Sequence, residues 1–377
     1  MRWIDKDEQM DEVLQDLKQA STFFIDTEFE STRKRTRLSV IQVSRGEELY
    51  LLDALALSRL RELGEIMVRD DVNWVLHAGT QDVELLLECF RQPKPPRLFD
   101  TQAAWAMTTL EGSVSLAYLQ YRLLGIRTMK THQADDWIRR PLPKSQLEYA
   151  ANDIRYLPQL HEKLSSTLEQ MGRTSIVSDA CYDQLWPKPE APEVLTLRSF
   201  RHAWQLSPRN QAALRYLIKW YNELPNWEKE RGPQTKTLLA VASRLPKIPK
   251  DLMRIKGIPP HFAHGYADTL VRGVARATRD ASTEEFEQIE PVPYLTPHEL
   301  EVDAWISQLR ACVALELQAA PELCFPLRVQ KEWRRRLLSG ETAEGVAASL
   351  EGWRKELLST AINTFVSRHP SPTRPEN

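Results

Sequence analysis

Hydrophobic positions in the first 180 residues alternate between helical and extended spacing. Apolar residues recur at helical spacing in 10–17, and 22–29 then reads as a strand that is apolar at its start. The same patterns predict strands at 38–44, 48–53 and 73–77, and helices at 58–69 and 81–90. Three consecutive strands followed by helix, strand and helix are typical of an α/β domain with a mixed sheet and flanking helices.

The remainder of the chain has a helical pattern. Nearly all residues from 101 to 171 are predicted to be helical. Proline clusters mark linkers at 187–192 and 291–297 and a tail at 370–375. Because no strand is predicted beyond Pro192, we expect two small helical bundles there. The predicted domains are residues 1–180, 195–278 and 295–368.

Charge is distributed unevenly, although the net charge is only -2 at pH 7. Residues 1–180 and 281–377 each carry a net charge of -5, whereas residues 181–280 carry +8. A local excess of Lys and Arg is typical of a surface that binds a phosphate backbone, and equally of a solvated face. The four cysteines have no metal-binding spacing, and no stretch approaches the roughly 18 apolar residues that span a membrane. We therefore expect a protein of the reducing cytoplasm with no membrane partner.

Two carboxylates follow large apolar residues in the segment FFIDTEFE. Residues two apart on a strand share a face, so Asp26 and Glu28 project together. Two acids on one side of a buried strand repel each other and are costly to desolvate unless a cation lies between them. The pair predicts a divalent metal site, and the alternative is a solvated strand end.

A third acid follows the predicted strand at 73–77 in the segment HAGTQD. Asp82 would lie in the first turn of the next helix, a place that the helix dipole favours without any function. The functional interpretation is that Asp82 meets Asp26 and Glu28, because ligand sites on α/β sheets lie at the carboxyl ends of strands. His77 could contact a phosphate or serve as a hydrogen-bonded core residue.

Tyr149 and Asp153 lie four residues apart in a segment with strong helical character, 145–169. This spacing places them one turn apart on the same helix face. A phenol beside an acid is often only a surface hydrogen bond. It becomes part of a catalytic site if Asp153 binds the same metal as Asp26 and Glu28, leaving Tyr149 to orient the attacking water.

Together these segments closely resemble ribonuclease D, a family of ribonuclease H-like 3′-5′ exonucleases of the DEDDy type, with four acids and a tyrosine. The runs that carry the resemblance are FFIDTEFE, HAGTQDVELL, FDTQAAW and DDWIRRPLPKSQLEYAANDIRYL. The resemblance implies an α/β ribonuclease H-like exonuclease domain. It assigns Asp26 and Glu28 to the first motif, Asp82 to the second, and Tyr149 and Asp153 to the third.

The resemblance also implies hydrolysis with two divalent metal ions, Mg²⁺ or Mn²⁺, and release of nucleoside 5′-monophosphates. Asp26, Glu28 and Asp153 would hold the ion that activates the nucleophilic water. Asp26 would bridge to the second ion, which Asp82 would hold largely through water. Tyr149 would hydrogen-bond the attacking water.

Substrate contacts are expected near the first motif and in two basic segments. Phe29 either packs against the last base or belongs to the core. The basic run at 33–37 either guides the RNA backbone or is a solvated loop, and Lys130, Arg139 and Arg140 have the same two interpretations. The residues predicted to bind substrate are Thr27, Phe29, His77, Arg33, Lys34, Arg35 and Lys130.

Ribonuclease D chains usually continue into two helical HRDC modules, and two segments here are similar to them. Residues 196–277 contain WQLSPR and IKGIPP, and interleave aromatic residues with the basic ones of the +8 block. Residues 297–366 contain GWRKELL near their end and form a weaker match. The resemblance therefore implies an exonuclease domain followed by two all-α HRDC-like bundles.

The function expected from the resemblance is a monomeric exoribonuclease that trims the 3′ ends of structured RNA, such as tRNA precursors. One alternative is a DNA 3′-5′ exonuclease of the Werner-syndrome type, which shares the acids. Another is a non-catalytic RNA-binding scaffold, which the presence of all five motif residues argues against.

Overall fold

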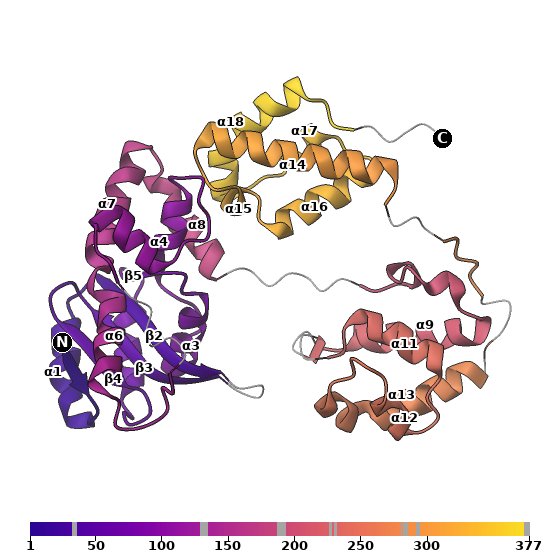
Figure 1. The fold of residues 1–377 in the computed structure, drawn as a ribbon, viewed down its shortest axis with the longest axis horizontal. Helices are drawn as coiled ribbons and strands as arrows, with labels where there is room; N and C mark the ends of the chain where they lie inside the picture. The colour runs from indigo at the N-terminus through magenta and orange to yellow at the C-terminus, as the bar shows by residue number, and fades with distance from the viewer. Residues whose placement is uncertain are drawn as a thin grey trace. The chain divides into compact units, whose positions relative to one another are not determined.

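The N-terminal part of the chain forms a six-stranded mixed sheet (Figure 1). The computed structural model describes residues 1–31, 36–128, 135–186, 194–225, 228–229, 232–279, 281, 286–291 and 295–372. The strands are β1 (Arg2–Ile4), β2 (Thr22–Ser31), β3 (Thr36–Ser44), β4 (Leu49–Asp53), β5 (Asn73–Leu76) and β6 (Arg97–Asp100). Their order across the sheet is β1-β4-β3-β2-β5-β6. Strand β3 runs antiparallel to β2 and β4, and the other neighbouring pairs are parallel.

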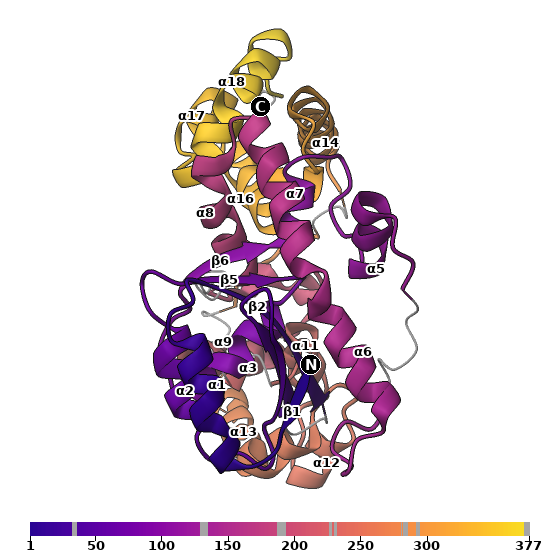
Figure 2. The ribbon, with the colours of Figure 1, turned by 90° about the vertical axis from the view of Figure 1, so that its left-hand side faces the viewer.

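Helices cover both faces of this sheet. They are α1 (Met10–Leu17), α2 (Leu60–Met67), α3 (Thr80–Phe90), α4 (Thr101–Ala106), α5 (Leu116–Leu119), α6 (Lys144–Arg155), α7 (Leu157–Gln170) and α8 (Thr174–Leu185). Figure 2 shows α1 and α2 on one face and α6 on the other. The apolar face of α1 is fully buried at Met10, Val13 and Leu17, as its helical spacing predicts.

The hydrophobic pattern predicted most of these elements and failed in two places. Strands β1 and β6 were not predicted, because each is short and contains only two apolar residues, whereas the equally short β5 contains three in a row. The prediction of near-continuous helix up to residue 171 is wrong for 107–115, for 125–128 and for 135–143. Gly125 has a φ of 71° and ends the preceding helical turn in the left-handed conformation, and Pro141 and Pro143 keep the chain extended before α6.

The C-terminal residues form a helical segment that packs against the sheet domain. Its helices are α14 (Pro297–Leu317), α15 (Pro321–Cys324), α16 (Leu327–Leu338), α17 (Ala343–Ala348) and α18 (Gly352–Arg368). Helix α18 contacts α8, and the Ala320 N–H donates a 2.7 Å hydrogen bond to the carbonyl of Ala106. Leu323 and Trp353 are buried in the same hydrophobic core as the sheet. The C-terminal helices and the sheet domain therefore form one compact unit.

Residues 189–296 form a separate compact unit with its own hydrophobic core. Its helices are α9 (Pro208–Glu223), α11 (Thr235–Arg244), α12 (Pro249–Met253) and α13 (Pro260–Arg279). Leu214, Leu238 and Leu270 are buried in that core. Across the described part of the chain, no helix combines the length and apolarity needed to cross a membrane.

Candidate active site

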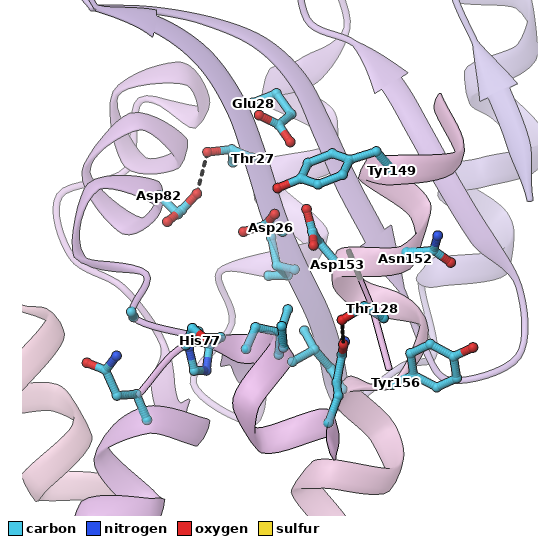
Figure 3. Close-up of a pocket in the computed structure, with 18 of the residues that line it drawn as sticks. Asp26, Thr27, Glu28, His77, Asp82, Thr128, Tyr149, Asn152, Asp153 and Tyr156 are labelled. Carbon is cyan, nitrogen blue, oxygen red and sulfur yellow. Dashed lines mark hydrogen bonds between the residues drawn. The ribbon is translucent and has the colours of Figure 1, made fainter. Parts of the chain in front are cut away.

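Three carboxylates from two elements converge beside β2. Asp26 and Glu28 lie two residues apart on this strand, so both project from the same face. Asp153 lies on α6, which packs against the strand. One carboxylate oxygen of each residue lies within 4.8 Å of the other two (Figure 3). Oxygen donors at this spacing suit a hard divalent cation such as Mg²⁺ or Mn²⁺.

A fourth carboxylate, Asp82, approaches from the first turn of α3. The Thr27 hydroxyl donates a 2.5 Å hydrogen bond to Asp82 Oδ1 and so ties α3 to β2 (Figure 3). Asp82 lies near enough for its charge to act on Asp26, as the electrostatics below show. The structure thus brings together the four acids that the sequence singled out.

The turn that leads into α3 is held by a buried acid that the sequence motifs included without assigning a role. Ala78 has a φ of 54°, in the left-handed region that non-glycine residues rarely adopt. Asp100 Oδ1 accepts hydrogen bonds from the N–H groups of Ala78, at 3.0 Å, and Gln102, at 2.8 Å. At Gly79, a Cβ atom would lie 2.8 Å from the Leu76 side chain, so only glycine fits without displacement. These contacts fix the start of the helix that carries Asp82.

The acids line a cleft of about 1000 Å³ and repel one another. Burial, followed by the charges of Asp82, Asp153 and Glu28, raises the pKa of Asp26 well above its ordinary value. Burial and the charges of Asp153 and Asp82 raise the pKa of Glu28 to about 9. A divalent cation would relieve this repulsion and allow the carboxylates to ionise at neutral pH. The donor set therefore fits a divalent metal.

Tyr149 lies one helical turn before Asp153, and its hydroxyl points toward the acids (Figure 3). Burial and the charge of Asp153 raise the pKa of Tyr149, so the phenol stays protonated at neutral pH and can donate a hydrogen bond. The buried ring of Trp137 packs against Tyr149, with 6.3 Å between the ring centroids. Trp137 belongs to a matched segment of the sequence, but its support of Tyr149 is visible only in the fold.

The segment that carries Trp137 is fastened to the sheet by Arg140. The Arg140 guanidinium donates hydrogen bonds of 2.6 and 2.7 Å to the two carboxylate oxygens of Asp53 and one of 3.2 Å to the carbonyl of Ser39. Glu30 Oε1 accepts a 3.3 Å hydrogen bond from the Trp137 N–H. Neither the RNA contact nor the solvated loop expected for Arg140 describes this arrangement, because its guanidinium is paired with Asp53 and anchors the segment to the sheet.

The predicted substrate contacts divide into those that line the cleft and those that the structure does not describe. Thr27, Phe29 and His77 line the cleft. The His77 ring nitrogens hydrogen-bond Thr101 Oγ1 at 2.9 Å and the Val114 carbonyl at 3.1 Å, as the hydrogen-bonded alternative predicts. Arg33, Lys34, Arg35 and Lys130 lie outside the described residues.

Comparison with known proteins agrees with this geometry. A sequence model described as 3′-5′ exonuclease matches residues 1–169. The chain is 28% identical to a ribonuclease D of Pseudomonas paraeruginosa over 375 residues, which cover 96% of each chain. It is 32% identical to a ribonuclease D of Xanthomonas oryzae pv. oryzae over 252 residues, covering 66% of this chain and 68% of that one.

Similarity to a solved structure extends over nearly the whole molecule. The crystal structure of Escherichia coli RNase D, described as an exoribonuclease involved in structured RNA processing, superposes with a TM-score of 0.72 at 25% identity. The superposition covers 98% of this chain and 99% of that one. With the convergent acids and these relatives, the chain belongs to the ribonuclease D family of 3′-5′ exoribonucleases.

Proposed function

We propose that the cleft hydrolyses the 3′-terminal phosphodiester of RNA with two divalent metal ions, Mg²⁺ or Mn²⁺, and releases nucleoside 5′-monophosphates. The observation that carries the proposal is the set of oxygens from Asp26, Glu28 and Asp153 that lie within 4.8 Å of one another. When bound, the metal ions would polarise the scissile phosphate and lower the pKa of the attacking water.

Each residue of the cleft has a separate part in this mechanism. Asp26, Glu28 and Asp153 would hold one ion, and Asp26 would also face the second. Asp82 would hold the second ion largely through water, with its carboxylate oriented by the Thr27 hydroxyl at 2.5 Å. The protonated Tyr149 would donate a hydrogen bond that orients the attacking water, and its raised pKa keeps that proton in place.

For the substrate we propose the 3′ ends of structured RNA, with tRNA precursors as the leading candidate. The similarity to the Escherichia coli exoribonuclease supports this class. The net charge of +8 over residues 181–280 supports a contribution of the central helical unit to RNA binding. We propose that this unit and the C-terminal helices are both HRDC-like modules.

The decisive experiment uses matched RNA and DNA strands, each labelled at either the 3′ or the 5′ end. The strands are incubated with Mg²⁺, with Mn²⁺ or with EDTA, and with wild-type protein or Asp153→Asn. We expect metal-dependent release of labelled mononucleotides from the 3′-labelled RNA, and none by the variant. Digestion of the DNA as well or instead would support the DNA exonuclease alternative. Binding of RNA without digestion would support the scaffold.

A further inference from the structure

One wall of the cleft is built from an irregular helical stretch whose residues have no assigned role. Residues 115–117, Gln120 and 126–128 line the cleft along this wall. Helix α5 continues into a π-helical turn over Gln120–Leu124, which Gly125 ends. Single π-helical turns are rare and occur frequently at functional sites. The wall is therefore a candidate part of the substrate site.

Hydrogen bonds hold this wall in one conformation. The Thr128 hydroxyl donates a 2.6 Å hydrogen bond to Gln120 Oε1, and the Gln120 side chain is buried (Figure 3). The backbone N–H of Ile126 donates to the carbonyl of Gln120 at 3.2 Å, and that of Gly125 donates to the carbonyl of Tyr121 at 3.0 Å. Because the backbone before residue 127 and the side chain of Thr128 after it are both hydrogen-bonded, the wall presents the Arg127 side chain from a stable support.

Arg127 is the only Lys or Arg among the lining residues that the structure describes. The same lining contains five acids, namely Asp26, Glu28, Asp82, Glu148 and Asp153. Within the described part of the chain, no ion pair of Arg127 with a carboxylate is found, and its guanidinium instead lies 5.4 Å from the centroid of the Tyr121 ring. Tyr121 is 49% exposed. A strand of RNA that enters an acidic cleft needs cationic contacts for its phosphates beyond the metal ions.

We propose that Arg127, held by the ring of Tyr121, binds a phosphate of the RNA strand as its 3′ end enters the cleft. The inference rests on the proposed function and adds to it the position of one backbone contact. Guanidinium groups bind phosphate through paired hydrogen bonds, and an aromatic face beneath the guanidinium limits its orientations without neutralising its charge. Tyr121 is thus a positioning residue, and Arg127 is a substrate-binding residue.

Arg122 offers a matched control on the same stretch of chain. Its guanidinium lies 5.9 Å from the centroid of the Tyr118 ring, and it is also exposed. Arg122 does not line the cleft, and the Tyr118 hydroxyl donates to Glu111 at 2.7 Å. If a stacked, exposed arginine were merely a solvated side chain, the two substitutions would have the same effect.

The test measures steady-state hydrolysis of a single-stranded RNA with Mg²⁺ at several KCl concentrations. We expect Arg127→Ala to raise KM about 10-fold and to lower kcat by a smaller factor. It should also reduce the slope of log KM against log salt by about one. Tyr121→Ala should raise KM about 3-fold, and Tyr121→Phe, which keeps the aromatic face, should restore wild-type KM. Arg122→Ala should remain within 2-fold of wild type.

The outcomes separate this inference from the proposed function. Suppose that the wild-type protein releases mononucleotides but that Arg127→Ala and Arg122→Ala have equal KM values and equal salt slopes. This result would overturn the role of Arg127 and leave the nuclease assignment intact. A wild-type protein that releases no mononucleotides would contradict the proposed function itself. Circular dichroism spectra and melting temperatures of all variants should match those of the wild type, because Tyr121, Arg122 and Arg127 are all exposed.

Discussion

Asp26 in the cleft and Asp183 on α8 are both largely withdrawn from water, but their surroundings differ. Asp26 is surrounded by other acids, and burial together with their charges raises its pKa. Asp183 accepts hydrogen bonds from Arg328 and Arg354. Burial alone would raise the pKa of Asp183, but the two arginines lower it overall.

The difference separates acids that stabilise the fold from acids that need a ligand. At Asp183, the ion pairs join α8 of the sheet domain to the C-terminal helices, so the compensating charges come from the chain itself. In the cleft, the described residues supply no such compensation to Asp26 and Glu28, and repulsion among the acids destabilises the protein without metal. Perturbed acids in a cleft are a mark of a functional site. This comparison predicts opposite effects of similar substitutions in the two places.

The largest effect is expected from Asp26→Asn. Removal of this proposed metal ligand should lower kcat for RNA hydrolysis by roughly three orders of magnitude or more, because the metal would supply most of the electrostatic stabilisation. Stability without metal should be unchanged or increased, because a buried acid that must either be protonated or repel its neighbours is lost. Rates of mononucleotide release and urea unfolding curves in EDTA measure the two effects. A variant with near-normal kcat would remove Asp26 from the metal site.

Asp183→Asn should act in the opposite way. Arg354 is largely buried, and loss of the Asp183 charge leaves its guanidinium without an ionic partner. We therefore expect the free energy of unfolding to fall by about 2 kcal/mol. This is below the roughly 3–5 kcal/mol of a fully buried pair because solvent reaches the site. The kcat of the folded protein should stay near wild type. Glu12→Gln, which breaks the exposed pair with Arg2, is the control and should have no measurable effect on stability.

Tyr149→Phe tests the cleft without changing its charge. It removes the hydroxyl that faces the acids but keeps the ring that packs against Trp137. We expect kcat to fall about 10- to 100-fold, as for loss of one positioning hydrogen bond, with metal affinity unchanged. Single-turnover rates at saturating Mn²⁺ separate the two quantities. A loss that excess metal restores would instead mean that Tyr149 supports metal binding.

The smallest effect concerns pH. The pKa of Glu28 is about 9 in the folded protein and about 4.5 in the unfolded chain. The tighter binding of a proton by folded Glu28 therefore contributes fully to stability below about pH 4.5, and this contribution is lost as pH rises toward 9. For Asp183 the pH dependence is reversed, because its pKa is lowered in the folded protein. The stability contributed by ionised Asp183 is present at neutral pH and is lost only as pH falls below about 4. In EDTA, Glu28→Gln should therefore gain at least about 1 kcal/mol of stability relative to wild type between pH 5 and pH 9. Parallel pH profiles of the two proteins would contradict this prediction.

The sequence predicted much of the cleft, because its acids lie on regular elements. Alternation on a strand placed Asp26 and Glu28 on one face, and a four-residue spacing placed Tyr149 beside Asp153. The motifs, through their resemblance to the ribonuclease D family, predicted that the acids of β2, α3 and α6 lie together. The order of the central elements was likewise visible in the periodicity.

Other features depend on contacts between distant parts of the chain, which periodicity does not reveal. Asp183 is 145 residues from Arg328 and 171 from Arg354, so neither pair could be predicted. The wall that carries Arg127 was predicted as ordinary helix, whereas a π-helical turn and Gly125 aim it at the cleft. The sequence leaves Arg140 as a possible RNA contact, because it does not reveal the pairing of Arg140 with Asp53, 87 residues away.

The most direct test of the comparison is a titration with Mn²⁺, followed by electron paramagnetic resonance, on wild-type protein, Asp26→Asn and Asp183→Asn in the absence of RNA. We expect wild type and Asp183→Asn to bind Mn²⁺ alike, and Asp26→Asn to lose at least 10-fold in affinity for Mn²⁺. Equal binding of Mn²⁺ by Asp26→Asn and wild type would contradict the claim that the mutually repelling acids of the cleft are there to hold metal.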